Sequence, residues 1–324
     1  MKAIVYHRYG PPAVLQHLEI EKPTAADNQV LLRVCAASLN PLDWHYMRGT
    51  PYVVRIIAGL SKPKVTGLGV DVAGQVEAVG ESVTQFKPGD HVFGTCHGAF
   101  AEYVCTSPAE LVVKPANVTF EQAASAPIAA FTALQGLRKG QIQAGQKVLV
   151  NGAAGGVGTF AVQIAKSVGA DVTGVCSTRN MDMVRSIGAD RVIDYTRDDF
   201  TRGENRYDLL FDTVGNHELT ARRRVLNPNG ICIMAGGPSG RWKMGLATAI
   251  RALVLSKFGS RRLIGFLARA NPQDLATIRD LLHSRKVTPV IDRTYPLSEV
   301  PAAIRYLEEG HARGKVVIAL HWYE

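Results

Sequence analysis

Three features that would place the chain in other classes of protein are missing from its sequence. The five cysteines are far apart and form no C-x-x-C pair, which argues against a disulfide framework and a cysteine zinc cluster. The longest apolar stretch, 245–258, is interrupted by Arg251 and Lys257 and is shorter than the roughly 18–20 apolar residues that cross a bilayer. No long apolar leader follows Met1. We therefore expect a globular cytoplasmic protein.

The sequence also lacks a concentrated basic patch, although its net charge is +9. Lysine and arginine are scattered along the chain apart from short clusters such as 222–224 and 261–262. A protein that binds nucleic acid usually gathers such charges on one face. We therefore expect a basic, solvated surface and no nucleic-acid partner.

What the chain does contain is a change of pattern near residue 120. Before it, short valine-rich runs broken by Gly, Pro and Asp predict an antiparallel, barrel-like domain. After it, apolar strands alternate with helical segments, as in βαβ units, which predicts a parallel sheet with right-handed crossovers. The fold class is therefore α/β. The last elements are more similar to the first domain, so we expect residues 1–120, completed by 273–324, to form one domain and 121–272 the other.

Individual elements can be assigned from the same periodicities. In the second domain the pattern predicts a helix over 156–168 and strands over 147–150, 171–176, 191–195, 208–212 and 230–235. Towards the end of the chain it predicts helices over 272–286 and 300–309 and strands over 287–293 and 315–320.

A glycine-rich turn follows the strand predicted at 147–150 and leads into the next helix. It has glycines at 152, 155 and 158. Glycine lets the backbone approach a pyrophosphate closely, and the N-terminus of the helix stabilises the negative charge. We expect Ala154, Gly155, Gly156 and Val157 to bind a dinucleotide; the alternative is a tight turn without a ligand.

No acidic residue stands at the end of the second strand, where an NAD-selective site usually has one to bind the ribose hydroxyls. The chain has Ser177 and Arg179 there instead. A guanidinium and a hydroxyl can bind the 2′-phosphate of NADP(H), which a carboxylate would repel. We expect Tyr195, which ends the third strand, either to lie against the same phosphate or to cover the sheet edge. NADP(H) is the cofactor we expect, with a solvated Arg179 as the alternative.

Several motifs together resemble the medium-chain dehydrogenase/reductase superfamily. They are Asn40-Pro41-Leu42-Asp43, the segments 69–74 and 86–92, and the glycine-rich turn. Within the superfamily, the chain is similar to the zeta-crystallin-like branch of quinone oxidoreductases and enone reductases. The resemblance implies a GroES-like β-barrel joined to a Rossmann-type domain, with the active site in the cleft between them.

The resemblance also implies that catalytic zinc is absent. Zinc-dependent members place their ligands at positions that are occupied here by Asn40, Val70 and about Ile128. Valine and isoleucine cannot ligate zinc, and an amide is a poor ligand for a metal that prefers thiolate and imidazole. The four-cysteine structural lobe is missing as well. We expect no metal.

Without a metal, another donor must stabilise the charge that hydride transfer leaves on oxygen. Conjugated substrates reduce this demand because the charge spreads into an enolate or a hydroquinone anion. We expect Asn40 and Asp43 beside the nicotinamide, Asn40 as a donor to oxygen and Asp43 as an orienting residue. Tyr46 and Tyr52 are candidate proton donors, with solvent as the alternative. Asn40 as a turn residue and Asp43 as a helix cap are equally compatible with the sequence.

The leading hypothesis is therefore an NADPH-dependent reductase of quinones or α,β-unsaturated carbonyls that acts without zinc, as a monomer or homodimer. One alternative is a zinc-free, NADP(H)-dependent alcohol dehydrogenase or aldehyde reductase. Another is an NADPH-binding structural or regulatory protein with little turnover. The basic and apolar segment 241–262 is compatible with a packing helix, a lid, a dimer contact or a weak membrane-surface contact.

Overall fold

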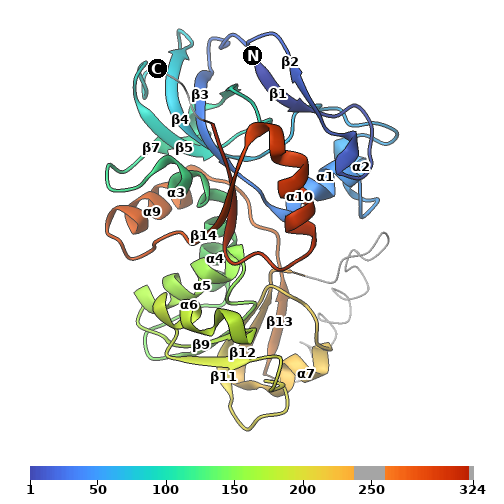
Figure 1. Ribbon diagram of the computed structural model, residues 1–324. Helices are drawn as coiled ribbons and strands as arrows, with labels where there is room; N and C mark the ends of the chain where they lie inside the picture. The colour runs from blue at the N-terminus through green and yellow to red at the C-terminus, as the bar shows by residue number, and fades with distance from the viewer. Residues whose placement is uncertain (237–259, 321–324) are drawn as a thin grey trace. The chain divides into compact units, whose positions relative to one another are not determined.

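The computed structural model describes residues 1–236 and 260–320, which fold into two units (Figure 1). The first unit contains Met1–Ala129, Ala270–Arg285 and Pro289–Glu324. The second contains Ala130–Arg269 and Lys286–Thr288. The domain boundaries that we expect from the sequence, after 120 and 272, stay a prediction.

The first unit is built on a seven-stranded sheet with the order β14-β15-β3-β4-β5-β7, in which β6 also pairs with β3. Its strands are β3 (Val30–Ser38), β4 (Asp71–Val79), β5 (His91–Thr95), β6 (Tyr103–Thr106), β7 (Leu111–Val113), β14 (Ile291–Pro296) and β15 (Lys315–Ala319). The pairs are antiparallel except β14 with β15, which is parallel. A separate antiparallel pair joins β1 (Lys2–Val5) to β2 (Gln16–Glu19).

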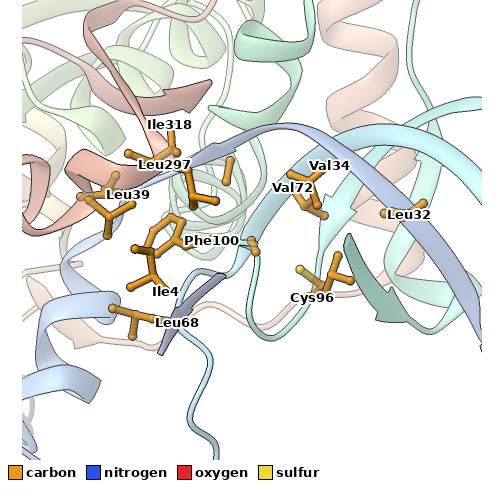
Figure 2. Close-up of a cluster of buried hydrophobic side chains, with 14 of the residues drawn as sticks. Ile4, Leu32, Val34, Leu39, Leu68, Val72, Cys96, Phe100, Leu297 and Ile318 are labelled. Carbon is orange, nitrogen blue, oxygen red and sulfur yellow. The ribbon is translucent and has the colours of Figure 1, made fainter. Parts of the chain in front are cut away.

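The core of the first unit is apolar and draws on both ends of the chain. β3 is buried along most of its length, and its side chains meet residues from β4, β15 and the segment before β6 (Figure 2). The short helices of this unit are η1 (Pro12–Val14), α1 (Pro41–Arg48), α2 (Val54–Ala58), η2 (Pro108–Glu110), α3 (Phe120–Ala124) and η4 (Leu297–Glu299). Two longer helices follow later in the chain, α9 (Pro272–His283) and α10 (Val300–Glu308).

The second unit contains a six-stranded sheet in which every pair is parallel, as the sequence predicts. Its order is β10-β9-β8-β11-β12-β13. The strands are β8 (Lys147–Asn151), β9 (Asp171–Cys176), β10 (Arg191–Asp194), β11 (Tyr207–Asp212), β12 (Leu226–Met234) and β13 (Arg262–Gly265). Its helices are α5 (Gly156–Ser167), η3 (Thr178–Asn180), α6 (Met181–Ser186) and α7 (Leu219–Arg224), and α4 (Pro127–Lys139) enters it from the first unit.

Two element boundaries differ from the sequence prediction for reasons of backbone chemistry. The strand expected over 287–293 begins at Ile291, after Pro289, because proline has no N–H to donate to a strand ladder. The alanine-rich stretch 120–138 forms two helices, α3 and α4, with the break before Pro127. A residue that precedes proline is disfavoured in helical geometry.

The sequence predicts that the basic residues are solvated, and for Arg222 this prediction is wrong. The side chain of Arg222 is buried, with 4% of the residue exposed, and its Nε lies 3.0 Å from Oδ2 of Asp212. A charged side chain is buried only when it is paired, and this pair lies inside the second unit.

The segment 241–262 lies mostly outside the described residues, so its predicted roles stay open. Within the described part of the chain, no helix is long and apolar enough to span a membrane.

Candidate cofactor and substrate sites

The glycine-rich turn connects β8 to α5, and two of its glycines are required by the backbone. Gly152 has φ +85°, where an L side chain is strained. A Cβ on Gly158 would lie 2.0 Å from the carbonyl oxygen of Gly152, so any side chain at Gly158 would push the turn apart. These glycines serve the fold whether or not a ligand is bound.

Gly155 differs because the space beside it is open. A Cβ placed there would meet only the carbonyl oxygen of Gly152, at 3.4 Å. Gly155 is the N-cap of α5, whose first turn contains Gly156 and Val157, and Ala154 precedes it. An open approach to the N-terminus of a twelve-residue helix suits a phosphate, because unpaired backbone N–H groups point outwards there. The turn therefore fits the pyrophosphate of a dinucleotide.

A buried polar cluster holds this turn in place, and the sequence pattern did not reveal it. Asn151, the last residue of β8, donates from Nδ2 to Oδ1 of Asp212 at 2.9 Å and to Oδ1 of Asn216 at 3.0 Å. The hydroxyl of Thr213 donates to the carbonyl oxygen of Asn151 at 2.8 Å. The end of β11 thus fixes the point where the glycine-rich turn begins.

The residues expected to bind a 2′-phosphate lie at one edge of the second unit. β9 and β10 are neighbouring parallel strands, and the backbone N–H of Tyr195 donates to the carbonyl oxygen of Cys176 at 3.0 Å. Ser177 and Arg179 follow Cys176 directly. Arg179 is exposed, and 56% of Tyr195 is exposed. The structure therefore brings the backbone positions of Ser177 and Tyr195 together, with Arg179 beside them.

A carboxylate that we did not single out from the sequence, Asp194, also lies at this edge. It accepts hydrogen bonds from the hydroxyls of Thr178 and Thr196, at 2.5 and 2.7 Å, and from the backbone N–H of Thr196. The hydroxyl of Thr178 is the largest cause that lowers the pKa of Asp194. Asp194 thus accepts three hydrogen bonds within the protein, and these bonds fix its orientation at this edge.

The polar centre of the first unit is a buried cluster around Asp71. Oδ2 of Asp71 accepts from the hydroxyl of Ser38 at 2.9 Å and from Nδ2 of Asn40 at 2.8 Å. The ammonium of Lys315 donates to Oδ1 of Asn40 at 2.6 Å and lies 3.3 Å from Oδ2 of Asp71. The backbone N–H of Ile128 donates to the other oxygen of Asp71 at 3.0 Å. Residues from three other parts of the sequence therefore converge on one carboxylate.

Asp43 lies beside this cluster and caps α1 from inside the helix. Its Oδ2 accepts from the backbone N–H of Asn40 at 2.7 Å, which is the helix-cap role that the sequence left open. Burial raises the pKa of Asp43 to about 7, and the negative charge of Asp71 adds to the rise. The backbone N–H of Asn40 and the charge of Lys315 oppose it. Asp43 thus changes its protonation state near neutral pH.

The two candidate proton donors lie on and beyond α1. Tyr46 is half-buried on α1 and packs against the apolar core of the first unit. Tyr52 is half-buried after the end of α1, and its ring lies 5.0 Å from the guanidinium of Arg55. Of the four residues proposed from the sequence, Asn40 and Asp43 are joined directly by a hydrogen bond.

The residues of the first unit do not fit a catalytic zinc ion. The amide oxygen of Asn40 accepts a hydrogen bond from the ammonium of Lys315, so the one oxygen that could ligate a metal cation already faces a positive charge. At the other two positions, Val70 and Ile128 offer no donor side chain. Residues 1–236 and 260–320 contain no group of three or more His, Cys, Asp or Glu side chains that could hold a metal ion.

Comparison with known proteins places the chain among dehydrogenases. Residues 26–116 match the alcohol dehydrogenase GroES-like domain, and residues 187–318 match the family described as zinc-binding dehydrogenase.

Two plant reductases match nearly the whole chain. The chain is 34% identical to the 2-methylene-furan-3-one reductase of Solanum lycopersicum, over 98% of this chain and 79% of that protein. It is also 34% identical to the chloroplastic NADPH-dependent alkenal/one oxidoreductase of Arabidopsis thaliana, with the same coverage.

A solved structure shows the same fold. The quinone oxidoreductase from Coxiella burnetii superposes with a TM-score of 0.86, at 33% identity, and each chain covers 99% of the other. The motifs at Asn40–Asp43, in segments 69–74 and 86–92 and at the glycine-rich turn thus predicted the family correctly. The chain belongs to the medium-chain dehydrogenase/reductase superfamily, in the branch of quinone oxidoreductases and enone reductases.

Proposed function

We propose that the protein is an NADPH-dependent oxidoreductase that reduces quinones or α,β-unsaturated carbonyl compounds without zinc. The observation that carries the proposal is the polar centre of the first unit, where a buried ion pair holds the amide of Asn40 in place of a set of metal ligands. The relatives are named as reductases of a furanone, of alkenals or enones, and of quinones, which supports the same substrate class.

The second unit supplies the binding site for the cofactor in this proposal. Gly155, with Ala154, Gly156 and Val157 beside it, receives the pyrophosphate at the start of α5. Ser177, Arg179 and Tyr195 receive the 2′-phosphate. Arg179 contributes a charge-assisted hydrogen bond, and such bonds are roughly twice as strong as neutral ones.

When bound, NADPH supplies a hydride that adds to the β-carbon of an enone or to a quinone, and a proton completes the reduction. Asn40 then donates a hydrogen bond to the substrate oxygen, where negative charge develops. Asp43 fixes the backbone of Asn40. Tyr46, Tyr52 or solvent delivers the proton. A conjugated substrate suits this set of residues because its charge is delocalised and a neutral donor suffices.

The decisive experiment is a panel of quinones, enones and saturated aldehydes, each assayed with NADPH and with NADH. The proposal predicts turnover of quinones or enones with NADPH and little turnover of saturated aldehydes. Turnover confined to saturated carbonyls would favour an alcohol dehydrogenase or aldehyde reductase. Tight NADPH binding without turnover of any substrate would favour a structural or regulatory role.

The choice of cofactor can be tested at Arg179. Arg179→Ala removes the charge that faces the 2′-phosphate, so NADPH should bind roughly 10- to 100-fold more weakly, since a hydrogen bond to a charged group contributes about 1.5–3 kcal/mol. The affinity for NADH should change little. Arg185→Ala breaks an exposed ion pair with Asp182 and serves as the matched control. Equal losses for NADPH and NADH would contradict a role in recognising the 2′-phosphate.

We also propose that the protein acts as a monomer or homodimer in the cytoplasm. Light scattering of the purified protein measures the oligomeric state, and fractionation of the source cells measures the location. A larger assembly or recovery in an organelle would contradict this part of the proposal.

A further inference from the structure

Lys315 is a charged residue that is buried in the first unit. The residue that it contacts most closely, Asn40, lies 275 positions earlier in the sequence. Only 3% of Lys315 and 0% of Asp71 is exposed. Taking two charges out of water costs free energy, and replacing such a pair by apolar residues is often neutral or stabilising. A contribution to stability is therefore a weak explanation for the presence of this ion pair.

The two charges determine which way the amide of Asn40 points. An ammonium can only donate hydrogen bonds, and an ionised carboxylate can only accept them. Lys315 therefore requires the amide oxygen of Asn40 on its side, at 2.6 Å, and Asp71 requires the amide nitrogen on the other side, at 2.8 Å. A flipped amide would place its N–H groups against the ammonium and its oxygen against the carboxylate.

The backbone of Asn40 is held independently of its side chain. Asn40 is the N-cap of α1, and its own backbone N–H donates to the carboxylate of Asp43. Nδ2 of an asparagine carries two hydrogens. Asp71 accepts one, and among the described residues nothing accepts the other. The cluster thus leaves one amide N–H of fixed direction as an available donor.

We propose that Lys315 is a positioning residue, which, together with Asp71, holds the amide of Asn40 in the one orientation that presents an N–H to the substrate oxygen. This inference rests on the proposed function, because it assigns Asn40 its donor role there. Lys315 acts through Asn40 and needs no contact with the substrate.

The test is a double-mutant cycle between Lys315 and Asn40. Lys315→Met should lower kcat for an enone or quinone roughly 10- to 100-fold, because a misplaced group of the active site costs about that much. The Kd of NADPH, whose proposed site lies in the second unit, should stay within about twofold. Asn40→Ala should lower kcat by a similar factor, and adding Lys315→Met to it should cause no further loss. Lys315→Arg keeps a charged donor and should restore part of the turnover.

Two controls separate positioning from folding. Lys22→Met breaks an exposed ion pair with Glu77 in the same unit and should leave kcat unchanged. If Lys315→Met does not fold because Asp71 is left as an unpaired buried charge, the charge-neutral pair Asp71→Asn with Lys315→Met takes its place, and the same loss of kcat is expected. An unchanged kcat in Lys315→Met or in the charge-neutral pair, or losses that multiply with Asn40→Ala, would overturn the inference.

A spectroscopic measurement distinguishes failure of this inference from failure of the proposed function. The side-chain amide signals of Asn40, assigned by their loss in Asn40→Ala, should shift and exchange faster with solvent in Lys315→Met. We expect this result even if the wild-type protein reduces neither quinones nor enones. Such a lack of turnover would overturn the proposed function but not the orienting role of Lys315. Signals that stay unchanged would overturn the orienting role of Lys315.

Discussion

Asp43 shows at the scale of one residue how burial changes a charge. Its pKa is about 7, against roughly 3.9 for an aspartate in an unfolded chain. Between these two values the folded protein keeps a proton that the unfolded chain releases. The contribution of Asp43 to stability is therefore fully present below about pH 4 and is lost as the pH rises through 7.

Asp43→Asn should remove this dependence on pH. Asparagine can still accept from the backbone N–H of Asn40, so the capping hydrogen bond remains. The free energy of unfolding of the wild-type protein, relative to the variant, should fall by up to about 1.4 kcal/mol for each pH unit between pH 4 and 7. Urea denaturation of both proteins at several pH values measures it.

The control for this experiment is a capping residue that does not titrate. Gln122 in α3 accepts from the backbone N–H of Thr119 at 3.1 Å, as Asp43 accepts from Asn40. Gln122→Ala should therefore shift stability by the same amount at every pH. Unfolding curves for wild type and Asp43→Asn that stay parallel across the range would show that Asp43 does not carry the raised pKa.

At the scale of an element, the glycine-rich turn separates the needs of the fold from those of the ligand. Gly158→Ala would place Cβ 2.0 Å from a backbone oxygen, so it should lower Tm clearly and weaken NADPH binding with it. Gly155→Ala meets only one atom, at 3.4 Å, and its φ of −82° is allowed for alanine. This variant should keep its Tm and still lose NADPH affinity. Calorimetry and fluorescence titration measure both quantities.

The comparison of the two variants contains its own control, because each changes a glycine to alanine in the same turn. Equal Tm losses would mean that the space beside Gly155 is not open. Unchanged NADPH affinity in Gly155→Ala would mean that the pyrophosphate lies elsewhere.

At the scale of the whole molecule, our proposal that the protein acts without zinc rests on residues that are far apart in the sequence. Asn40 and Ile128 both contact Asp71, while Lys315 from the end of the chain supplies the positive charge. We expect the purified protein to contain much less than one zinc per chain. Dialysis against a chelator should leave both Tm and NADPH-dependent turnover unchanged.

Elemental analysis by mass spectrometry of the protein used for kinetics measures its zinc content. A zinc-dependent alcohol dehydrogenase treated in the same way should lose its activity and provides the control. Stoichiometric zinc, or activity that returns only when zinc is added back, would contradict the donor-set interpretation of Asn40, Val70 and Ile128.

The sequence alone determined the features whose cause is local. A strand followed by glycines and a helix predicts a phosphate-binding turn, because turn geometry and the helix N-terminus depend on neighbouring residues. The parallel sheet, the family and the missing acid near Ser177 were readable for the same reason. Asn40 and Asp43 were candidates because they share one short motif, although their alternative roles in the turn and cap remained open.

Tertiary structure alone decided which distant side chains share a buried site. Nothing near Lys315 in the sequence marks it as a partner of Asn40, and the basic run at 222–224 gives no sign that Arg222 is buried against Asp212. Strand pairing sets the first of these contacts, since β15 joins β3 and thereby carries Lys315 to Asn40 and Asp71. The pKa of Asp43 likewise depends on burial, which the packed fold creates and the sequence pattern does not show.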